Sequence, residues 1–177
     1  AEPVPAWQVL RQRDIESRFE ALRGSVLTRL IGRDEEIDLL LRRWARAKAG
    51  EGQVVLVSGE AGLGKSRLVA ALETHLRVEP HFRVHYFCSP YTQNSALFPF
   101  VDQLSRASGF ARDDPPASKL ERLEAVLRRA APPDEDLGLL ADLLSLPGSE
   151  HYKLPSLSPQ RKKQRTLEAL IRQLDGM

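Results

Sequence analysis

The chain has 177 residues, with 26 lysines and arginines against 24 aspartates and glutamates, and a formal net charge of +2. Its hydrophobic content of 42% and charged content of 28% are typical of a globular protein and exclude wholesale disorder. The single cysteine excludes an internal disulfide, and the nearly balanced charge gives no reason to expect a nucleic acid partner.

The N-terminal segment, residues 1–24, opens with Pro3 and Pro5, which favour an extended chain, and continues with mixed acidic and basic residues. This composition predicts a solvated linker, with a binding arm as the alternative. The segment lacks the basic-then-apolar pattern of a secretory signal, and no apolar run of membrane-spanning length occurs in the chain. We therefore expect a cytoplasmic protein without a membrane partner.

The first predicted helix follows a turn at residues 31–33. Its acidic residues fall in the first turn and its basic residues in the later part, as the helix dipole favours. Gly50 and Gly52 end it. Apolar residues at helical spacing form its buried face: Ile37, Leu40, Leu41 and Trp44. From the residues alone, the turn before the helix has no further assigned role.

A glycine-rich pattern, G-x-x-x-x-G-K-[ST], comes next, with Gly59, Gly64, Lys65 and Ser66 at its fixed positions. The apolar run at residues 54–57 predicts a strand that is buried on both faces of a parallel sheet. Apolar residues that recur at helical spacing after the pattern predict a helix. The order of strand, loop and helix is the context that a phosphate-binding loop requires.

The chemistry of this loop favours a polyphosphate and Mg²⁺, with a glycine-rich turn and a chance lysine as the alternative. Glycines let backbone N–H groups turn toward an anion, and the following helix presents the positive end of its dipole to the same anion. Lys65 is expected to reach the β- and γ-phosphates, and the Ser66 hydroxyl to bind the metal. The predicted binding residues are Gly59, Glu60, Ala61, Gly62, Leu63, Gly64, Lys65, Ser66 and Arg67.

The second half of the chain predicts one more strand, at residues 82–87, and then helices. The helices are expected at residues 97–108, around residues 120–130, at residues 135–146 and from Pro159 onward, where Ser158 caps the last helix. The basic run at residues 161–165 predicts a solvated helix face, with contact to an acidic partner as the alternative.

Hydrolysis of a bound nucleotide would require a carboxylate at the end of a second buried strand. Asp142 ends an apolar run, but this run keeps helical spacing, so we interpret Asp142 as a residue on a helix surface. No catalytic residue is assigned. We expect the 177-residue chain to show little or no ATPase activity by itself.

Three segments together resemble a known family: Leu30–Glu36, Gly59–Leu68 and Cys88–Tyr91. They are similar to the origin-recognition-complex-like AAA ATPase module of signal-transducing NTPases. The resemblance is greatest to the bacterial adenylate/guanylate cyclase-associated ATPases, in which the module follows a class III cyclase domain. Pro3–Leu10 looks like the segment that leaves the cyclase in those proteins.

The resemblance implies an α/β fold, the three-layer AAA-like P-loop NTPase fold, with only its N-terminal part present as two strands and several helices. Residues 1–24 would follow an upstream cyclase domain, residues 25–177 would begin the ATPase domain, and a helical region would come downstream. The family's strand order implies that the two strands do not pair with each other. ATP and Mg²⁺ would be the cofactors, and the residues that border the adenine would be Ile31, Gly32 and Arg33.

The function expected from this resemblance is that of an ATP-binding module in a signal-transducing ATPase, which regulates an attached cyclase or effector. ATP hydrolysis is expected of the intact protein. One alternative is a DNA-associated initiator or transcription-regulator ATPase, because the same module precedes DNA-binding domains in other proteins. The other alternative is a non-catalytic interaction segment.

Overall fold

A computed structural model of the chain describes residues 30–147, 151–152 and 154–176. The linker that the sequence predicts at residues 1–24 lies outside the described residues, as does Pro3–Leu10. The chain divides into two compact units, of which the first ends at His81 and the second begins at Phe82. Each unit buries apolar residues of its own.

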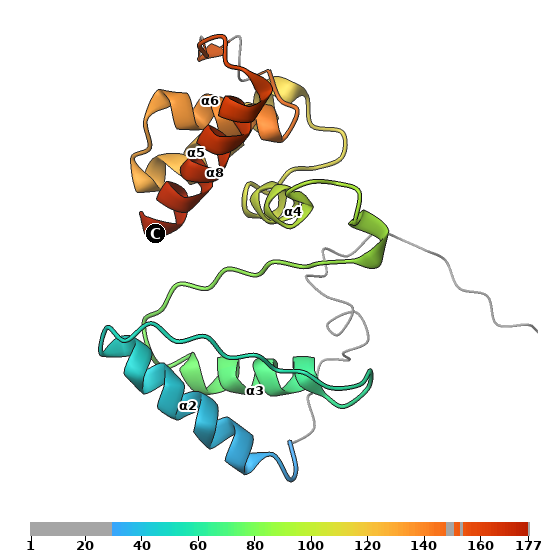
Figure 1. The fold of residues 1–177 in the computed structure, drawn as a ribbon, viewed down its shortest axis with the longest axis vertical. Helices are drawn as coiled ribbons and strands as arrows, with labels where there is room; N and C mark the ends of the chain where they lie inside the picture. Colours follow the sequence, from blue (N-terminus) through green and yellow to red (C-terminus); the bar gives the residue numbers. More distant parts are fainter. Residues whose placement is uncertain (1–29, 148–150, 153, 177) are drawn as a thin grey trace, which may run out of the picture. The chain divides into compact units, whose positions relative to one another are not determined.

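The described residues of the first unit form two helices, α2 (Asp34–Lys48) and α3 (Lys65–Leu76), which lie side by side (Figure 1). Between them, Ile37 and Leu40 of α2 pack with Leu68 of α3 in a small apolar core. The first turn of α2 is acidic and its last turn is basic. The structure thus confirms both helices that the sequence predicts in this part of the chain.

Glu79 joins the chain that leaves α3 to the end of α2. The Trp44 Nε1–H group donates to Glu79 Oε2 at 2.7 Å, and Lys48 Nζ lies 2.8 and 2.9 Å from the two carboxylate oxygens. The hydrogen bond from Lys48, followed by that from Trp44, holds the pKa of Glu79 below its ordinary value. These contacts help to keep α2 beside α3, the helix that follows the glycine-rich loop.

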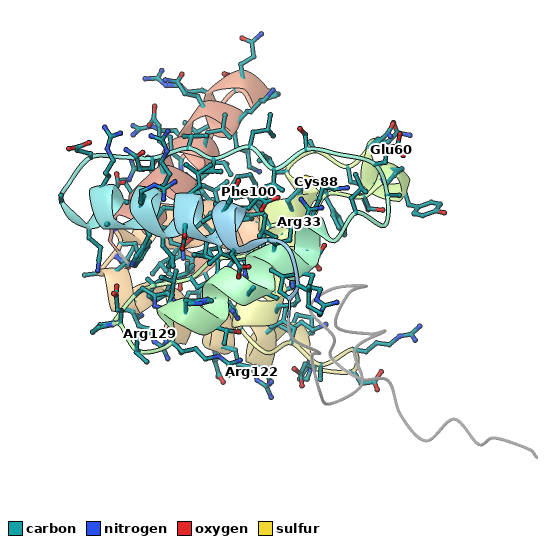
Figure 2. The ribbon with its side chains drawn as sticks, turned by 90° about the horizontal axis from the view of Figure 1, so that it is seen from below. Arg33, Glu60, Cys88, Phe100, Arg122 and Arg129 are labelled. Carbon is teal, nitrogen blue, oxygen red and sulfur yellow. The ribbon has the colours of Figure 1, made fainter. Side chains whose placement is uncertain are left out.

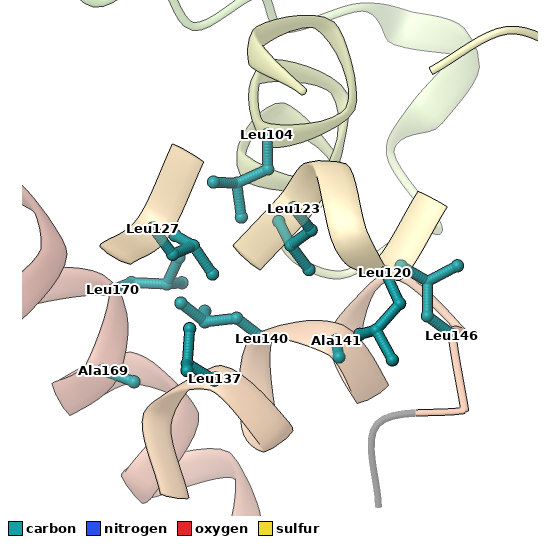
Figure 3. Packing of buried hydrophobic residues seen from close by; sticks show 10 residues of the cluster. All are labelled: Leu104, Leu120, Leu123, Leu127, Leu137, Leu140, Ala141, Leu146, Ala169 and Leu170. Atoms are coloured by element: carbon teal, nitrogen blue, oxygen red, sulfur yellow. The ribbon is translucent and has the colours of Figure 1, made fainter. Parts of the chain in front are cut away.

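The second unit is built from helices and short helical turns. Its elements are η1 (Pro90–Thr92), α4 (Phe98–Ala107), α5 (Pro116–Leu127), η2 (Arg128–Ala130), α6 (Asp134–Leu143) and α8 (Pro159–Asp175). Helix α6 packs against α5 and α8, and α4 packs against α5. Figure 3 shows the core between them, which contains Leu104, Leu120, Leu123, Leu127, Leu137, Leu140, Ala141, Leu146, Ala169 and Leu170.

Helix α8 begins where the sequence predicts it. Ser158 accepts a hydrogen bond from the Arg161 N–H at its N-terminus, and Pro159 occupies the first helical position. Asp142 lies in α6 with a partly exposed side chain and forms an ion pair with Lys162 of α8. The interpretation of Asp142 as a residue on a helix surface is therefore confirmed.

The predicted α/β fold class is wrong for the residues that the structure describes, because they form helices and no strand. Residues 54–57 run without a β-ladder, and the side chains of Val54 and Leu56 are 99% and 87% exposed instead of buried. Residues 82–87 also form no ladder, and Phe82 is exposed. Because neither predicted strand forms, the described residues do not test the expectation that the two strands do not pair with each other.

The predicted strands are absent from the described residues because a strand makes its backbone hydrogen bonds to a neighbouring strand and not within itself. A β-branched run supplies the propensity for an extended chain, but propensity does not supply a neighbour. Val57 is partly buried against the core of the first unit, whereas the side chains on either side of it are exposed. One edge of the run thus packs on the helices, and no ladder forms among the described residues.

Candidate functional site

Glycines shape the loop that precedes α3. Gly62 and Gly64 have φ angles of +88° and +81°, in the left-handed region that glycine adopts without steric cost. Gly64 is the N-cap of α3, which begins directly at Lys65. The spacing of glycine and lysine in the sequence pattern therefore fixes where the loop turns into the helix.

The N-terminus of α3 is suited to an anion. The first helical bond runs from the Leu68 N–H to the Gly64 carbonyl at 2.9 Å, so the N–H groups of Lys65 and Ser66 have no carbonyl partner within the helix. The first turn of α3 contains no acidic residue, whereas those of α2 and α6 do. The positive end of the α3 dipole is therefore not offset by a carboxylate of its own first turn.

The Lys65 ammonium lies across the loop. Its Nζ atom donates to the carbonyl oxygens of Gly59 and Glu60, at 2.8 and 2.7 Å. Figure 2 labels Glu60 in this loop. A phosphate oxygen that entered the loop would compete with these two carbonyls for the ammonium, and the negative charge would make it the stronger acceptor.

A pocket of about 420 Å³ lies beside the loop, within the first unit. Its lining comes from two segments that are distant in the sequence, the turn before α2 and the loop before α3. The lining residues are Leu30, Ile31, Arg33, Gly62, Leu63, Gly64 and Arg67. The packing of α2 on α3 therefore brings the turn at residues 31–33 to the glycine-rich loop.

Arg33 is held at this pocket by the helix that it precedes. Its Nη1 atom donates to Glu36 Oε1 at 2.5 Å, and this hydrogen bond lowers the pKa of the Glu36 carboxyl below its ordinary value. Figure 2 labels Arg33 where α2 begins. The ion pair is exposed, so it orients the Arg33 side chain with little effect on stability.

The structure brings together most of the residues that the sequence predicts for the site. Six of them line the pocket: Ile31, Arg33, Gly62, Leu63, Gly64 and Arg67. Gly59 and Glu60 bind the Lys65 ammonium. Gly32, Ala61 and Ser66 are not among the lining residues. Leu30 lines the pocket without having been predicted, and the signal for it was the apolar pair before Gly32.

In the parts of the chain that the structure describes, no group of three or more histidine, cysteine or acidic side chains could hold a metal ion. The same parts contain no helix that is long and apolar enough to cross a membrane.

Comparison with known proteins gives one family and one relative. The sequence model of the AAA ATPase domain family matches residues 29–177, a range that includes both segments of the pocket. The chain is 29% identical over 180 residues to the uncharacterized protein R02095 of Rhizobium meliloti (strain 1021). The alignment covers 100% of this chain and 17% of that protein. No solved structure matches the chain.

Proposed function

We propose that the glycine-rich loop and the adjoining pocket together bind ATP with Mg²⁺, because this chain belongs to the AAA ATPase domain family. The observation that carries the proposal is the pocket itself, in which Ile31 and Arg33 lie beside Gly62, Gly64 and Arg67. A nucleotide needs an anion site next to an apolar cleft, and these two segments provide both.

Each part of the loop has a role in this proposal. The Lys65 ammonium leaves the carbonyls of Gly59 and Glu60 and binds the β- and γ-phosphates. The N–H groups at the start of α3 bind the same phosphates. The base lies against Leu30 and Ile31, with Gly32 and Arg33 at its border. The remaining loop residues, Ala61 and Leu63, shape the cradle.

Ser66 is the proposed protein ligand of Mg²⁺. A bound Mg²⁺ neutralises phosphate charge and keeps most of its ligands as water and phosphate oxygens, so one hydroxyl from the protein is a sufficient anchor. Ser66 follows Lys65 directly in the first turn of α3, the position that the phosphate-loop pattern assigns to the metal ligand.

For the whole protein we propose a signal-transducing ATPase of the origin-recognition-complex-like type. In this proposal, residues 1–24 follow a cyclase domain, residues 25–177 begin the ATPase domain, and a helical region lies downstream in a cytoplasmic protein. The support is the resemblance of three segments of the sequence. The chain spans 17% of the length of its Rhizobium relative, so regulation of a cyclase or another effector is proposed for the whole protein and not for these 177 residues.

Replacement of Lys65 tests the proposed site. We expect Lys65→Ala to weaken binding of ATP and Mg²⁺ about tenfold or more, because it removes a charge-assisted partner of the phosphates. Isothermal titration calorimetry on the 177-residue chain measures the affinity. Lys163→Ala, at an exposed position of α8, is the matched control and should bind as the wild type does. Equal titration curves for wild type and Lys65→Ala would refute the assignment of the loop.

A further inference from the structure

The two helices of the first unit are joined at both of their ends. At the N-terminal end, the turn before α2 and the loop before α3 line the same pocket. At the C-terminal end, Glu79, which follows α3, accepts hydrogen bonds from Trp44 and Lys48 of α2. We call the contacts of Glu79 with these two residues the Glu79 clamp. The pocket and the Glu79 clamp therefore lie at opposite ends of α2.

His81 adds two contacts to the Glu79 clamp. Its ring meets the Trp44 indole edge-on, with the ring centroids 5.9 Å apart. Its Nδ1 atom and the carbonyl oxygen of Glu79 lie 2.8 Å apart. His81 is also the last residue of the first unit. The first unit thus ends in a short segment that is held against the C-terminal part of α2.

The apolar contact between α2 and α3 is small and lies between the Glu79 clamp and the pocket. Its buried residues are Ile37 and Leu40 of α2 and Leu68 of α3. Along the helix axis, Leu40 is about 6 Å from Trp44 and about 9 Å from the first residue of α2, because each residue adds about 1.5 Å. Apolar contacts are non-directional, so this contact by itself lets α2 tilt on α3. A tilt that moves the C-terminal end of α2 also moves the turn at residues 31–33.

We infer that Glu79 is a positioning residue for the nucleotide pocket, because it holds α2 at the tilt that places residues 31–33 beside the glycine-rich loop. This inference rests on the proposed nucleotide site and adds a means of regulating it. The loop binds phosphates by itself, whereas the nucleoside part of ATP also needs the turn. Displacement of the chain at the end of the first unit then lowers the affinity for ATP and leaves the affinity for a bare polyphosphate unchanged.

A comparison of ATP with inorganic tripolyphosphate tests this inference, because tripolyphosphate offers phosphates to the loop without a nucleoside for the turn. ATP with Mg²⁺ is titrated into the 177-residue chain by calorimetry, and the affinity for tripolyphosphate is measured by its displacement of ATP. The variants are Glu79→Ala and Glu79→Gln, of which the second keeps an acceptor oxygen without the charge. Circular dichroism spectra establish that each variant folds, and Glu79→Gln provides the test if Glu79→Ala does not fold.

Glu51→Ala is the matched control. Glu51 is an exposed carboxylate that also forms an ion pair near the C-terminus of α2, with Arg46 at 2.6 Å. It belongs to the chain that leaves α2, so its ion pair does not join α2 to the end of α3. Removal of this carboxylate should leave the affinities for both ligands as they are in the wild type.

Glu79→Ala should weaken ATP binding about fivefold, at the low end of the usual range for coupled sites, because the ion pair of the Glu79 clamp is partly exposed. Its affinity for tripolyphosphate should equal that of the wild type. Glu79→Gln should lose less affinity for ATP, because its amide oxygen still accepts from Trp44.

Four results would overturn the inference and leave the nucleotide site in place. They are equal losses for the two ligands, no loss for ATP, a loss of the same size in Glu51→Ala, and a wild-type chain that binds ATP but not tripolyphosphate. A wild-type chain that does not bind ATP would overturn the nucleotide site as well.

Discussion

Asp136 is a buried carboxylate that forms an ion pair with Arg172 of α8. Its residue is 2% exposed, in the first turn of α6, and its two oxygens accept hydrogen bonds from Arg172 Nε and Nη2 of α8, at 2.8 and 2.7 Å. The hydrogen bonds that Arg172 donates to this carboxylate raise the pKa of its guanidinium. Because a buried charge without a partner is costly, this pair ties α6 to α8 in one arrangement.

We predict that Arg172→Ala lowers the free energy of unfolding by about 3 kcal/mol, because Asp136 is then left buried without its counter-ion. Urea denaturation followed by circular dichroism measures the change. Arg161→Ala, at an exposed position of the same helix, is the control and should change it by less than about 0.5 kcal/mol. The double variant Asp136→Ala/Arg172→Ala should lose less than the sum of the two single variants. Additive losses would show that the two residues act independently.

The helices could be predicted from the sequence because the signals that mark them are local. Ser158 and Pro159 mark the start of α8 from within three residues, and the acidic first turn and basic last turn of α2 do the same for that helix. Apolar spacing then assigned the faces that Leu40 and Leu170 bury. Each of these signals acts within one or two helical turns, so no knowledge of the rest of the chain was needed.

The strands could not be predicted on the same grounds. Residues 54–57 have strand propensity, but a ladder needs a neighbour that the local sequence does not specify. The described residues provide none, so Val54 and Leu56 are exposed and only Val57 packs on the helical core. The prediction of a buried strand at residues 54–57 failed because strand propensity does not by itself indicate that a segment is buried.

The exposure of residues 54–57 predicts that the same substitution at two leucines changes the free energy of unfolding by different amounts. Leu56→Ala should change the free energy of unfolding by less than about 0.5 kcal/mol, because Leu56 is 87% exposed. Leu40→Ala should cost about 2 to 5 kcal/mol, because Leu40 is 8% exposed in the core of the first unit. Chemical denaturation of both variants measures the difference. A Leu56→Ala cost as large as that of Leu40→Ala would mean that residues 54–57 are buried.

The two segments of the candidate site differ in how they could be predicted. The loop was predictable from its pattern, because Gly59, Gly64, Lys65 and Ser66 are close together in the sequence. The turn at residues 31–33 carries no comparable local signal, and only the family resemblance pointed to it. The packing of α2 on α3 places this turn at the loop, and that contact also adds Leu30 to the pocket.

The loop and the turn before α2 should act as one nucleotide site. Amide hydrogen exchange of the 177-residue chain, measured by mass spectrometry with and without ATP and Mg²⁺, tests this proposal. Protection should increase at residues 59–67 and also at residues 30–33, and should stay constant along α8. At the same ATP concentration, Lys65→Ala should lose both increases together. Protection of residues 59–67 with no change at residues 30–33 would contradict a shared site, because the nucleotide would then occupy the loop without the pocket.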